Sequence, residues 1–311
     1  MLGFVNYLKV SQRFTRFSVM PELPEVETVC QGLNHRTCSA VITGGQVLLS
    51  RTIAYPPDGE AFLNGLRGTH IQSWQRRGKY LLAKLLRDDQ EAGWFGVHLR
   101  MTGQLLWVST KTPIDRHTRL RLSFAPGEDG VAQELRFVDV RTFGQVWWIP
   151  PDRSPEEVIT TLKKLGPEPL SPDFSAQYLQ QRLRKAQRSL KTALLDQALI
   201  AGLGNIYADE CLFLSGLHPQ TVAQVLTTAE IQQLVEAIVT VLTAGIAAGG
   251  TTLRDYRTVE GTNGNYGGQA WVYRRTGEPC RRCQTPIERI KLAGRSTHFC
   301  PSCQPLKGIL N

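Results

Sequence analysis

The sequence predicts an α+β protein in which a β-sandwich with a leading helix is followed by a helical domain and a short cysteine-rich segment. Three patterns predict this arrangement. Between residues 41 and 149, short β-leaning apolar runs are separated by Gly, Pro and Asp. From residue 176 to 248 the spacing of Leu, Ile, Val and Ala is helical, and two Cys-x-x-Cys pairs follow. A chain of 311 residues is long enough for about two domains.

The first elements are a basic extension and a helix. Residues 1–19 are basic and contain no acid. We interpret them as an upstream stretch placed before a true start at Met20, with a targeting peptide as the alternative. A helix is expected over residues 21–36, because prolines and acids fill its first turn and apolar residues recur on one side.

The remaining boundaries follow from changes in composition. Residues 20–150 are expected to form the amino-terminal β-sandwich domain, and the proline-rich stretch after it predicts a linker. A Gly-rich, aliphatic-poor loop of functional length follows the helical region. The later segments are a linker at 151–175, a helical domain at 176–250, a loop at 251–269 and the cysteine-rich segment at 270–311.

The charge and cysteine content narrow the class of protein. The formal net charge is +9, and residues 179–192 carry five cations without an acid. This clustering favours a polyanionic partner, with solvated surface charge as the alternative. Seven cysteines without a secretory signal indicate reduced thiols in a cytosol-like compartment. No run reaches the roughly 18 apolar residues of a membrane span, so no membrane partner is expected.

The cysteine pairs predict one structural zinc ion. Cys280 and Cys283 are followed, after sixteen residues, by Cys300 and Cys303. This spacing is typical of a four-thiolate zinc ribbon. Four protein ligands leave no open coordination position, so the metal is expected to brace the fold and not to catalyse. Arg289, Lys291, Arg295 and His298 lie between the pairs and are expected to face phosphate or a base edge.

Several motifs resemble those of formamidopyrimidine-DNA glycosylases. They occur in the family's order: PELPEVE from Pro21, QRRGKYL, HLRMTG, DVRTFG, LGPEPL, GLGNIYADE, GGTTLRDY and the terminal zinc ribbon. The resemblance covers about residues 20–303. It implies a helix-two-turn-helix domain and a repair enzyme for oxidised purines, 8-oxoguanine and formamidopyrimidines. This enzyme would act on double-stranded DNA, including abasic sites, as a monomer with one structural Zn²⁺.

The resemblance also implies the chemistry. A free proline is a secondary amine, so Pro21 can attack the sugar C1′ carbon and form an iminium after the base departs. Elimination in β and δ steps then cuts the strand. Glu22 is expected to donate a proton to the sugar ring oxygen and the leaving group, with Glu25 in support. Acids that merely complement the helix dipole are the alternative.

The same resemblance assigns DNA contacts. Extrusion of a nucleotide leaves a hole that must be filled. Met101 and Phe143 are expected to fill it while Arg141 reaches the orphaned base, although Arg100 and Thr142 depart from commoner residues beside them. Phosphate contacts are expected from Lys79, Arg295, His98 and Asn205, and Lys79 and Arg295 are also expected to be catalytic. Lys191 is expected to contact the lesion. The loop residues Thr251, Arg254 and Tyr266 are expected near the flipped base.

One feature departs from this chemistry. As numbered, Pro21 is a tertiary amide that cannot act as a nucleophile, so activity requires a start or cleavage at Met20 and removal of that methionine. Three rivals remain open: an endonuclease VIII-like pyrimidine glycosylase, a noncatalytic DNA-binding protein with Pro21 blocked, and a zinc-ribbon scaffold that binds protein. The expected location is cytoplasmic, near the nucleoid in a bacterium, with organellar targeting by residues 1–19 left open.

Overall fold

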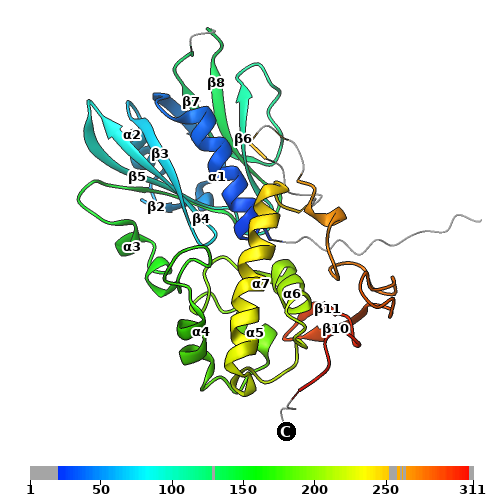
Figure 1. Ribbon diagram of the computed structural model, residues 1–311. Helices are drawn as coiled ribbons and strands as arrows, with labels where there is room; N and C mark the ends of the chain where they lie inside the picture. The colour runs from blue at the N-terminus through cyan, green and yellow to red at the C-terminus, as the bar shows by residue number, and fades with distance from the viewer. Residues whose placement is uncertain (1–19, 128–129, 252–257, 260, 262–263, 308–311) are drawn as a thin grey trace, which may run out of the picture.

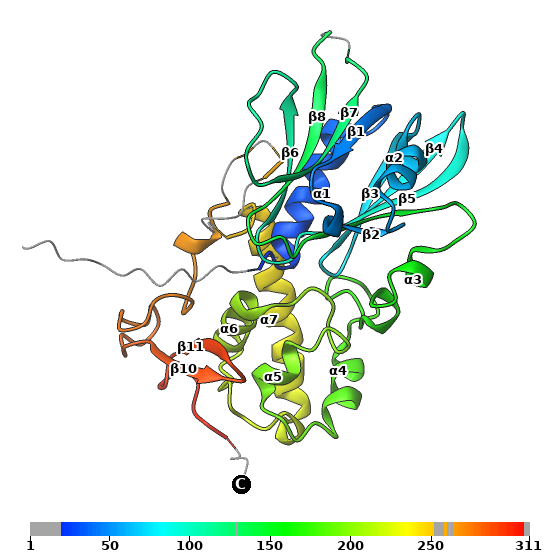
Figure 2. The same cartoon turned by 180° about the vertical axis from the view of Figure 1, so that it is seen from behind.

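The computed structural model describes residues 20–127, 130–251, 258–259, 261 and 264–307. A β-sandwich forms one end of the molecule and a group of helices forms the other (Figure 1). The reverse view shows the same division, with the hairpin of the cysteine-rich segment beside the helices (Figure 2). The expected extension at residues 1–19 lies outside the described residues.

The sandwich consists of two sheets. One has the strand order β1-β7-β8-β6 and the other β2-β9-β5-β4-β3. All strand pairs are antiparallel except β2 with β9. The strands are β1 (Ile42–Val47), β2 (Ile53–Tyr55), β3 (His70–Arg77), β4 (Tyr80–Arg87), β5 (Gln90–His98), β6 (Gly103–Ser109), β7 (Thr118–Phe124), β8 (Gln133–Asp139) and β9 (Gln145–Ile149). All nine lie between residues 41 and 149, where the sequence predicted β structure.

The leading helix α1 (Leu23–Thr37) joins the two ends of the molecule. Leu23, Val26, Val29 and Leu33 recur at helical spacing and are fully or almost fully buried. The helix contacts β3 on one side and α7 on the other. The start of the chain's described part is therefore held between the sandwich and the helices.

Two features of the sandwich were not expected. A short helix, α2 (Gly59–Leu66), lies in a stretch for which the sequence predicted no element, and Asp58 caps it by accepting from the backbone of Glu60 and Ala61. One of the apolar runs between residues 41 and 149, WFGVHLRMTGQLLWV at 94–108, divides between β5 and β6. The turn between them places Arg100 at φ +54°, in the left-handed region that few non-glycine residues adopt.

The segment at 151–175 is packed against the sandwich. It contains α3 (Pro155–Val158) and the 3₁₀ turn η2 (Leu162–Lys164). Ile159 and Leu162 are buried with Trp147 of β9. Glu168 accepts hydrogen bonds from the guanidinium groups of Arg76 and Arg77. The connection is thus fixed at several points along its length.

The second half is helical, with helices α4 (Ala176–Leu183), α5 (Leu190–Leu194), α6 (Asn205–Leu214) and α7 (Thr228–Ala247), and 3₁₀ turns η1 (Ser50–Thr52), η3 (Ala223–Val225) and η4 (Tyr266–Gly268) elsewhere. By length and composition α7 could cross a membrane. It packs against α1, α4 and α6, and Ile231, Leu234, Ile238 and Leu242 are buried there. Burial on these neighbours identifies α7 as a core helix.

The cysteine-rich segment ends in the hairpin β10 (Glu288–Leu292) and β11 (Arg295–Phe299). Strand β11 packs against α6. Glu210 of α6 accepts backbone hydrogen bonds from Trp271, Val272 and Tyr273. One helix therefore holds both the hairpin and the chain that leads into it.

Candidate active site

The Glu22 carboxylate lies against the first turn of α6. The backbone N–H groups of Ile206 and Tyr207 donate to its two oxygens at 2.9 and 3.3 Å. A Cβ atom on Gly204 would lie 2.2 Å from the carboxyl carbon of Glu22, so only glycine leaves room there. The side chain is 2% exposed. A residue at the start of the sandwich domain thus occupies the anion-binding end of a distant helix.

Burial raises the pKa of Glu22 to about 7. Nearby Lys79 and the two α6 amides oppose this rise, whereas Glu25 adds to it. A carboxyl group that titrates near neutral pH exchanges protons readily in both directions. Glu22 therefore has the ionisation expected of a general acid.

Glu25 is held from three sides. Its carboxylate accepts from the Glu22 backbone N–H at 2.9 Å and from the Tyr207 hydroxyl at 2.8 Å. The backbone N–H and hydroxyl of Thr251 donate to it at 2.7 and 2.5 Å. Since Glu25 is fully buried, these bonds fix the geometry of the Glu22 backbone.

A cavity of about 410 Å³ opens beside this start of the chain. Met20, Lys79, His98, Arg100 and Arg295 all line it, together with Gly204. The structure therefore brings together three expected residues, Lys79, His98 and Arg295, from the β3–β4 turn, β5 and β11. Arg100 also lines this cavity, a place the sequence did not predict for it.

Two basic side chains of this cavity, Lys79 and His98, have lowered pKa values. Burial lowers the pKa of Lys79, while Glu22 opposes that shift and Arg295 adds to it. Burial, with Arg100 and Lys79 nearby, holds the pKa of His98 well below its usual value, so its ring is neutral. The Nδ1 atom of His98 accepts from the Arg100 backbone N–H at 3.0 Å. A cavity with several cations suits a phosphate.

Asn205 begins α6, as expected, but the anion site beside it is already filled. The Asn205 amide donates to the Ser296 carbonyl at 3.1 Å. The first backbone N–H groups of the helix, which are suited to bind an anion, bind Glu22. The positive end of the helix therefore holds a carboxylate of the protein itself.

Lys191 and His298 lie inside the protein, contrary to expectation. The Lys191 ammonium pairs with Asp209 at 2.6 Å and donates to the Ser296 carbonyl at 3.0 Å and to Thr297 at 2.9 Å. Asp209 also accepts from the His298 backbone N–H at 3.0 Å. Burial lowers the pKa of Lys191, and Asp209 partly opposes that shift. In this structure both side chains bond to Asp209, and neither is among the described residues that line the cavity beside Glu22.

The sequence missed Asp209 and Glu210. An acidic pair within the apolar stretch Asn205–Leu214 was a usable signal, because acids rarely lie in apolar helices unless they are paired. Of the loop residues expected near the flipped base, the structure describes Thr251 and Tyr266. Tyr266 is buried with its ring centroid 5.2 Å from that of Tyr207, and Arg254 lies outside the described residues.

Three expected wedge residues come from two neighbouring loops. Met101 lies between β5 and β6, and Arg141 and Phe143 lie between β8 and β9. The Phe143 side chain is 53% exposed, and the Arg141 guanidinium carbon lies 4.9 Å from the centre of its ring. An exposed aromatic ring with a cation beside it suits contact with stacked bases.

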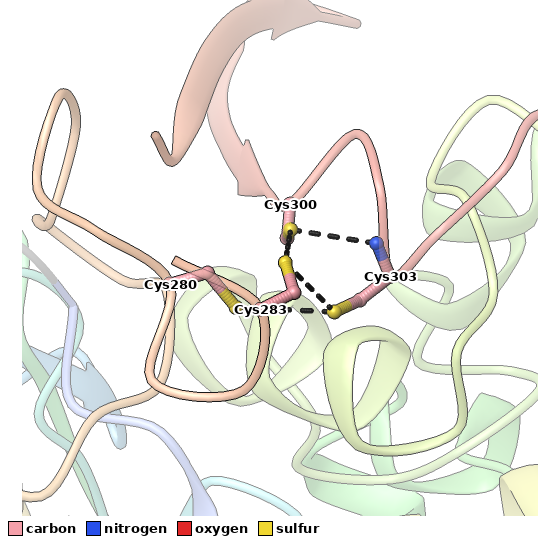
Figure 3. A group of neighbouring side chains, drawn as sticks. All are labelled: Cys280, Cys283, Cys300 and Cys303. Atoms are coloured by element: carbon pink, nitrogen blue, oxygen red, sulfur yellow. Dashed lines mark hydrogen bonds between the residues drawn. The ribbon is translucent and has the colours of Figure 1, made fainter. Parts of the chain in front are cut away.

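The four cysteines expected to bind zinc converge (Figure 3). Their sulfur atoms all lie within 4.8 Å of one another, and three of the pairs are 3.4, 3.4 and 3.9 Å apart. A tetrahedral zinc ion with Zn–S bonds of about 2.3 Å needs sulfur atoms roughly 3.8 Å apart. The donor set Cys280, Cys283, Cys300 and Cys303 therefore fits one zinc ion.

Comparisons with known proteins agree with this arrangement. Three family models match in order: the formamidopyrimidine-DNA glycosylase N-terminal domain over residues 20–146, the formamidopyrimidine-DNA glycosylase H2TH domain over 165–257, and the zinc finger found in FPG and IleRS over 277–306. They confirm the expected fold class, including the helix-two-turn-helix domain and the zinc ribbon.

Relatives that carry the name formamidopyrimidine-DNA glycosylase match over almost their whole length. One from a Synechococcus strain is 62% identical and covers 92% of this chain and 99% of the relative. One from Rippkaea orientalis is 58% identical and covers 92% and 100%. A solved complex of Lactococcus lactis Fpg with DNA containing an abasic site has a TM-score of 0.81 and 37% identity, covering 91% of this chain and 99% of that one. A complex with DNA containing Fapy-dG has a TM-score of 0.80 and 36% identity, covering 91% and 100%. The chain belongs to the formamidopyrimidine-DNA glycosylase family.

Proposed function

We propose that the chain is a base-excision repair enzyme that removes oxidised purines from duplex DNA and then cuts the strand as an abasic-site lyase. The observation that carries this function is the buried Glu22 carboxyl with a pKa of about 7, one residue from Pro21 and beside a cavity with several cations. The similar structures hold DNA with an abasic site or Fapy-dG, which supports the same class of substrate here.

Pro21, freed as an amino-terminal secondary amine, attacks C1′ of the lesion deoxyribose, and the bond from C1′ to the base breaks. Glu22 supplies the proton that the ring oxygen or the departing base needs. Ring opening gives an iminium, which acidifies the C2′ proton. Loss of that proton expels the 3′ phosphate, and a second elimination expels the 5′ phosphate.

The DNA contacts follow the charge and exposure of the side chains. Lys79 and Arg295 bind phosphates next to the lesion, with neutral His98 as a hydrogen-bonding partner. Met101 and Phe143 fill the hole left by the extruded nucleotide, and Arg141 reaches the orphaned base. The four cysteines hold zinc, which stabilises the segment that carries Arg295.

This mechanism requires that Pro21 be the first residue. We infer that translation from Met20, or cleavage there, precedes removal of the methionine. The family match begins at residue 20, which supports a functional start there. The enzyme acts as a monomer. Its family places it in a DNA-associated location, and the cytoplasm with the nucleoid is our proposal for the compartment.

Borohydride trapping tests the nucleophile directly. The chain begun at Met20 should form a covalent adduct with DNA containing 8-oxoguanine, and the chain begun at Met1 should do so only if it is processed. Digestion of the adduct should map it to Pro21, and mapping to a lysine would refute the mechanism. A duplex with thymine glycol tests the endonuclease VIII-like rival, which the names of the relatives do not favour. Binding without any adduct would support the noncatalytic alternative.

A further inference from the structure

The two wedge loops are tied together by one buried carboxylate, that of Asp139. This residue ends β8 and is 1% exposed. Its partner in the strand register is Gly103, which begins β6. The loop with Met101 therefore ends, and the loop with Arg141 and Phe143 begins, at adjacent points of the same sheet.

Both carboxylate oxygens of Asp139 accept hydrogen bonds from these loops. Oδ1 accepts from the hydroxyl of Thr102, next to Met101, and from the Arg141 backbone N–H at 3.2 Å. Oδ2 accepts from the Gly144 backbone N–H at 2.7 Å. The Arg141 N–H also donates to the Thr102 hydroxyl oxygen at 3.0 Å. One side chain thus joins the residue after Met101 to the residues that flank the tip of the second loop.

The packing beneath the loops leaves them little room to shift. A Cβ atom on Gly103 would lie 2.9 Å from the Phe137 ring, and one on Gly144 would lie 2.3 Å from it. Phe137 itself is fully buried. Both loops therefore rest on the same ring, with Asp139 fixing their spacing above it.

We propose that Asp139 is a positioning residue for base extrusion, because it sets the distance between Met101 and the pair Arg141 and Phe143. This inference rests on the proposed function. A wedge made from two loops can fill one hole in the base stack only if the loops keep a fixed separation. The backbone N–H groups of Arg141 and Gly144 can only donate, and they bond to different oxygens of the carboxylate. In either orientation an amide side chain at this position would turn its NH₂ group toward one of these donors and separate the loops.

The test uses Asp139→Asn in the chain begun at Met20, with two DNA duplexes. One carries 8-oxoguanine opposite cytosine, where a paired base must be extruded. The other carries an abasic site, where no base remains to be extruded. Under single-turnover conditions we expect excision of 8-oxoguanine to fall at least about tenfold, while cleavage at the abasic site stays within about twofold of the wild type.

A fluorescent base analogue beside the lesion reports unstacking directly. With 2-aminopurine next to 8-oxoguanine, the wild-type enzyme should raise the fluorescence as the wedge enters, and Asp139→Asn should diminish that rise. Glu134→Gln is the matched control. Glu134 is a buried acid on the same strand, but it bonds to Arg121 and Arg136 away from the wedge loops. It should leave the ratio between the two substrates unchanged.

A second variant guards against loss of folding. Thr102→Val keeps the carboxylate but removes the hydroxyl that links it to the first loop, and it should reproduce the selective loss. Equal losses on both substrates in the folded variants, or no loss on either, would overturn the role of Asp139. A wild-type chain that is inactive on both duplexes would instead overturn the proposed function.

Discussion

Replacing Glu22 by Gln removes the acidic proton and keeps nearly the same side-chain shape. The rise of the Glu22 pKa from 4.5 to about 7 corresponds to roughly 3 kcal/mol. Well below pH 4.5 the carboxyl is protonated in the folded and the unfolded chain, so its burial adds no pH-dependent cost. As the pH rises toward 7 the unfolded chain ionises first, and the folded state progressively loses stability relative to it.

The amide side chain in Glu22→Gln does not titrate, so the variant escapes this loss. It also offers only one acceptor to the two α6 amides, which costs about 1–2 kcal/mol at every pH. We therefore expect Glu22→Gln to be less stable than the wild type at about pH 5. Between about pH 5 and 8 the difference should shift by roughly 2–3 kcal/mol in favour of the variant.

Urea unfolding of both proteins between about pH 5 and 8 measures this difference. The chain begun at Met1 is the proper material, because there the Pro21 nitrogen is acylated as in the structure. Unfolding free energies whose difference does not change with pH would refute the assignment of a raised pKa to Glu22.

The catalytic part of the same prediction uses the chain begun at Met20. Excision of 8-oxoguanine by the wild type should fall about tenfold between about pH 6 and 8 as the acid is lost, and a protonated Pro21 amine would move this decline to lower pH. Glu22→Gln should lose at least about 100-fold in excision while it still binds the duplex. Normal excision by this variant would show that another group is the acid.

Three further changes test the surroundings of the site. Gly204→Ala should push the Glu22 carboxyl from its place, costing about 1–3 kcal/mol of stability and reducing excision. Thermal unfolding and single-turnover assays measure this, and Gly59→Ala at the start of α2, where a Cβ makes only ordinary contacts, is the control. Phe143→Ala should change stability by less than about 0.5 kcal/mol because the ring is half exposed, yet slow excision from paired duplexes about tenfold; an unchanged rate would remove Phe143 from the wedge. Removal of zinc by a chelator should unfold the cysteine-rich segment and abolish excision, and added zinc should restore both circular dichroism and activity. Full activity of the metal-free protein would contradict a structural role for the metal.

Much of the fold could be predicted because its signals are local. The alternation in Thr118–Phe124 gives a strand with buried and half-buried residues in strict turn. Helix α2 gave no comparable signal, since eight residues hold too few turns for a period to emerge. The turn at Arg100 was hidden for another reason: an arginine adopts the left-handed conformation there, in place of the glycine that would mark it.

The sequence predicted which residues gather near the candidate site better than it predicted where their side chains point. Lys79, His98 and Arg295, to which the resemblance assigned phosphate contacts, line one cavity. The same resemblance assigned a lesion contact to Lys191, yet this side chain is buried against Asp209. A motif fixes which residue occupies a position, whereas the partner that decides its orientation here lies on another helix.

Helix α6 explains how residues from distant parts of the chain meet. The backbone N–H groups of its first turn donate to Glu22. Its Asp209 forms an ion pair with Lys191 and accepts a backbone hydrogen bond from β11, the strand that carries Arg295. Its Glu210 accepts backbone hydrogen bonds from the segment after residue 270. Ionisable groups this deeply buried give little net stability, because desolvation offsets most of their attraction. They do define geometry, since each tolerates only the arrangement that satisfies all its hydrogen bonds. The buried acids of α6 thus fix the spacing between Glu22 and Arg295, and in the proposed mechanism the lesion and its phosphate must fit that spacing.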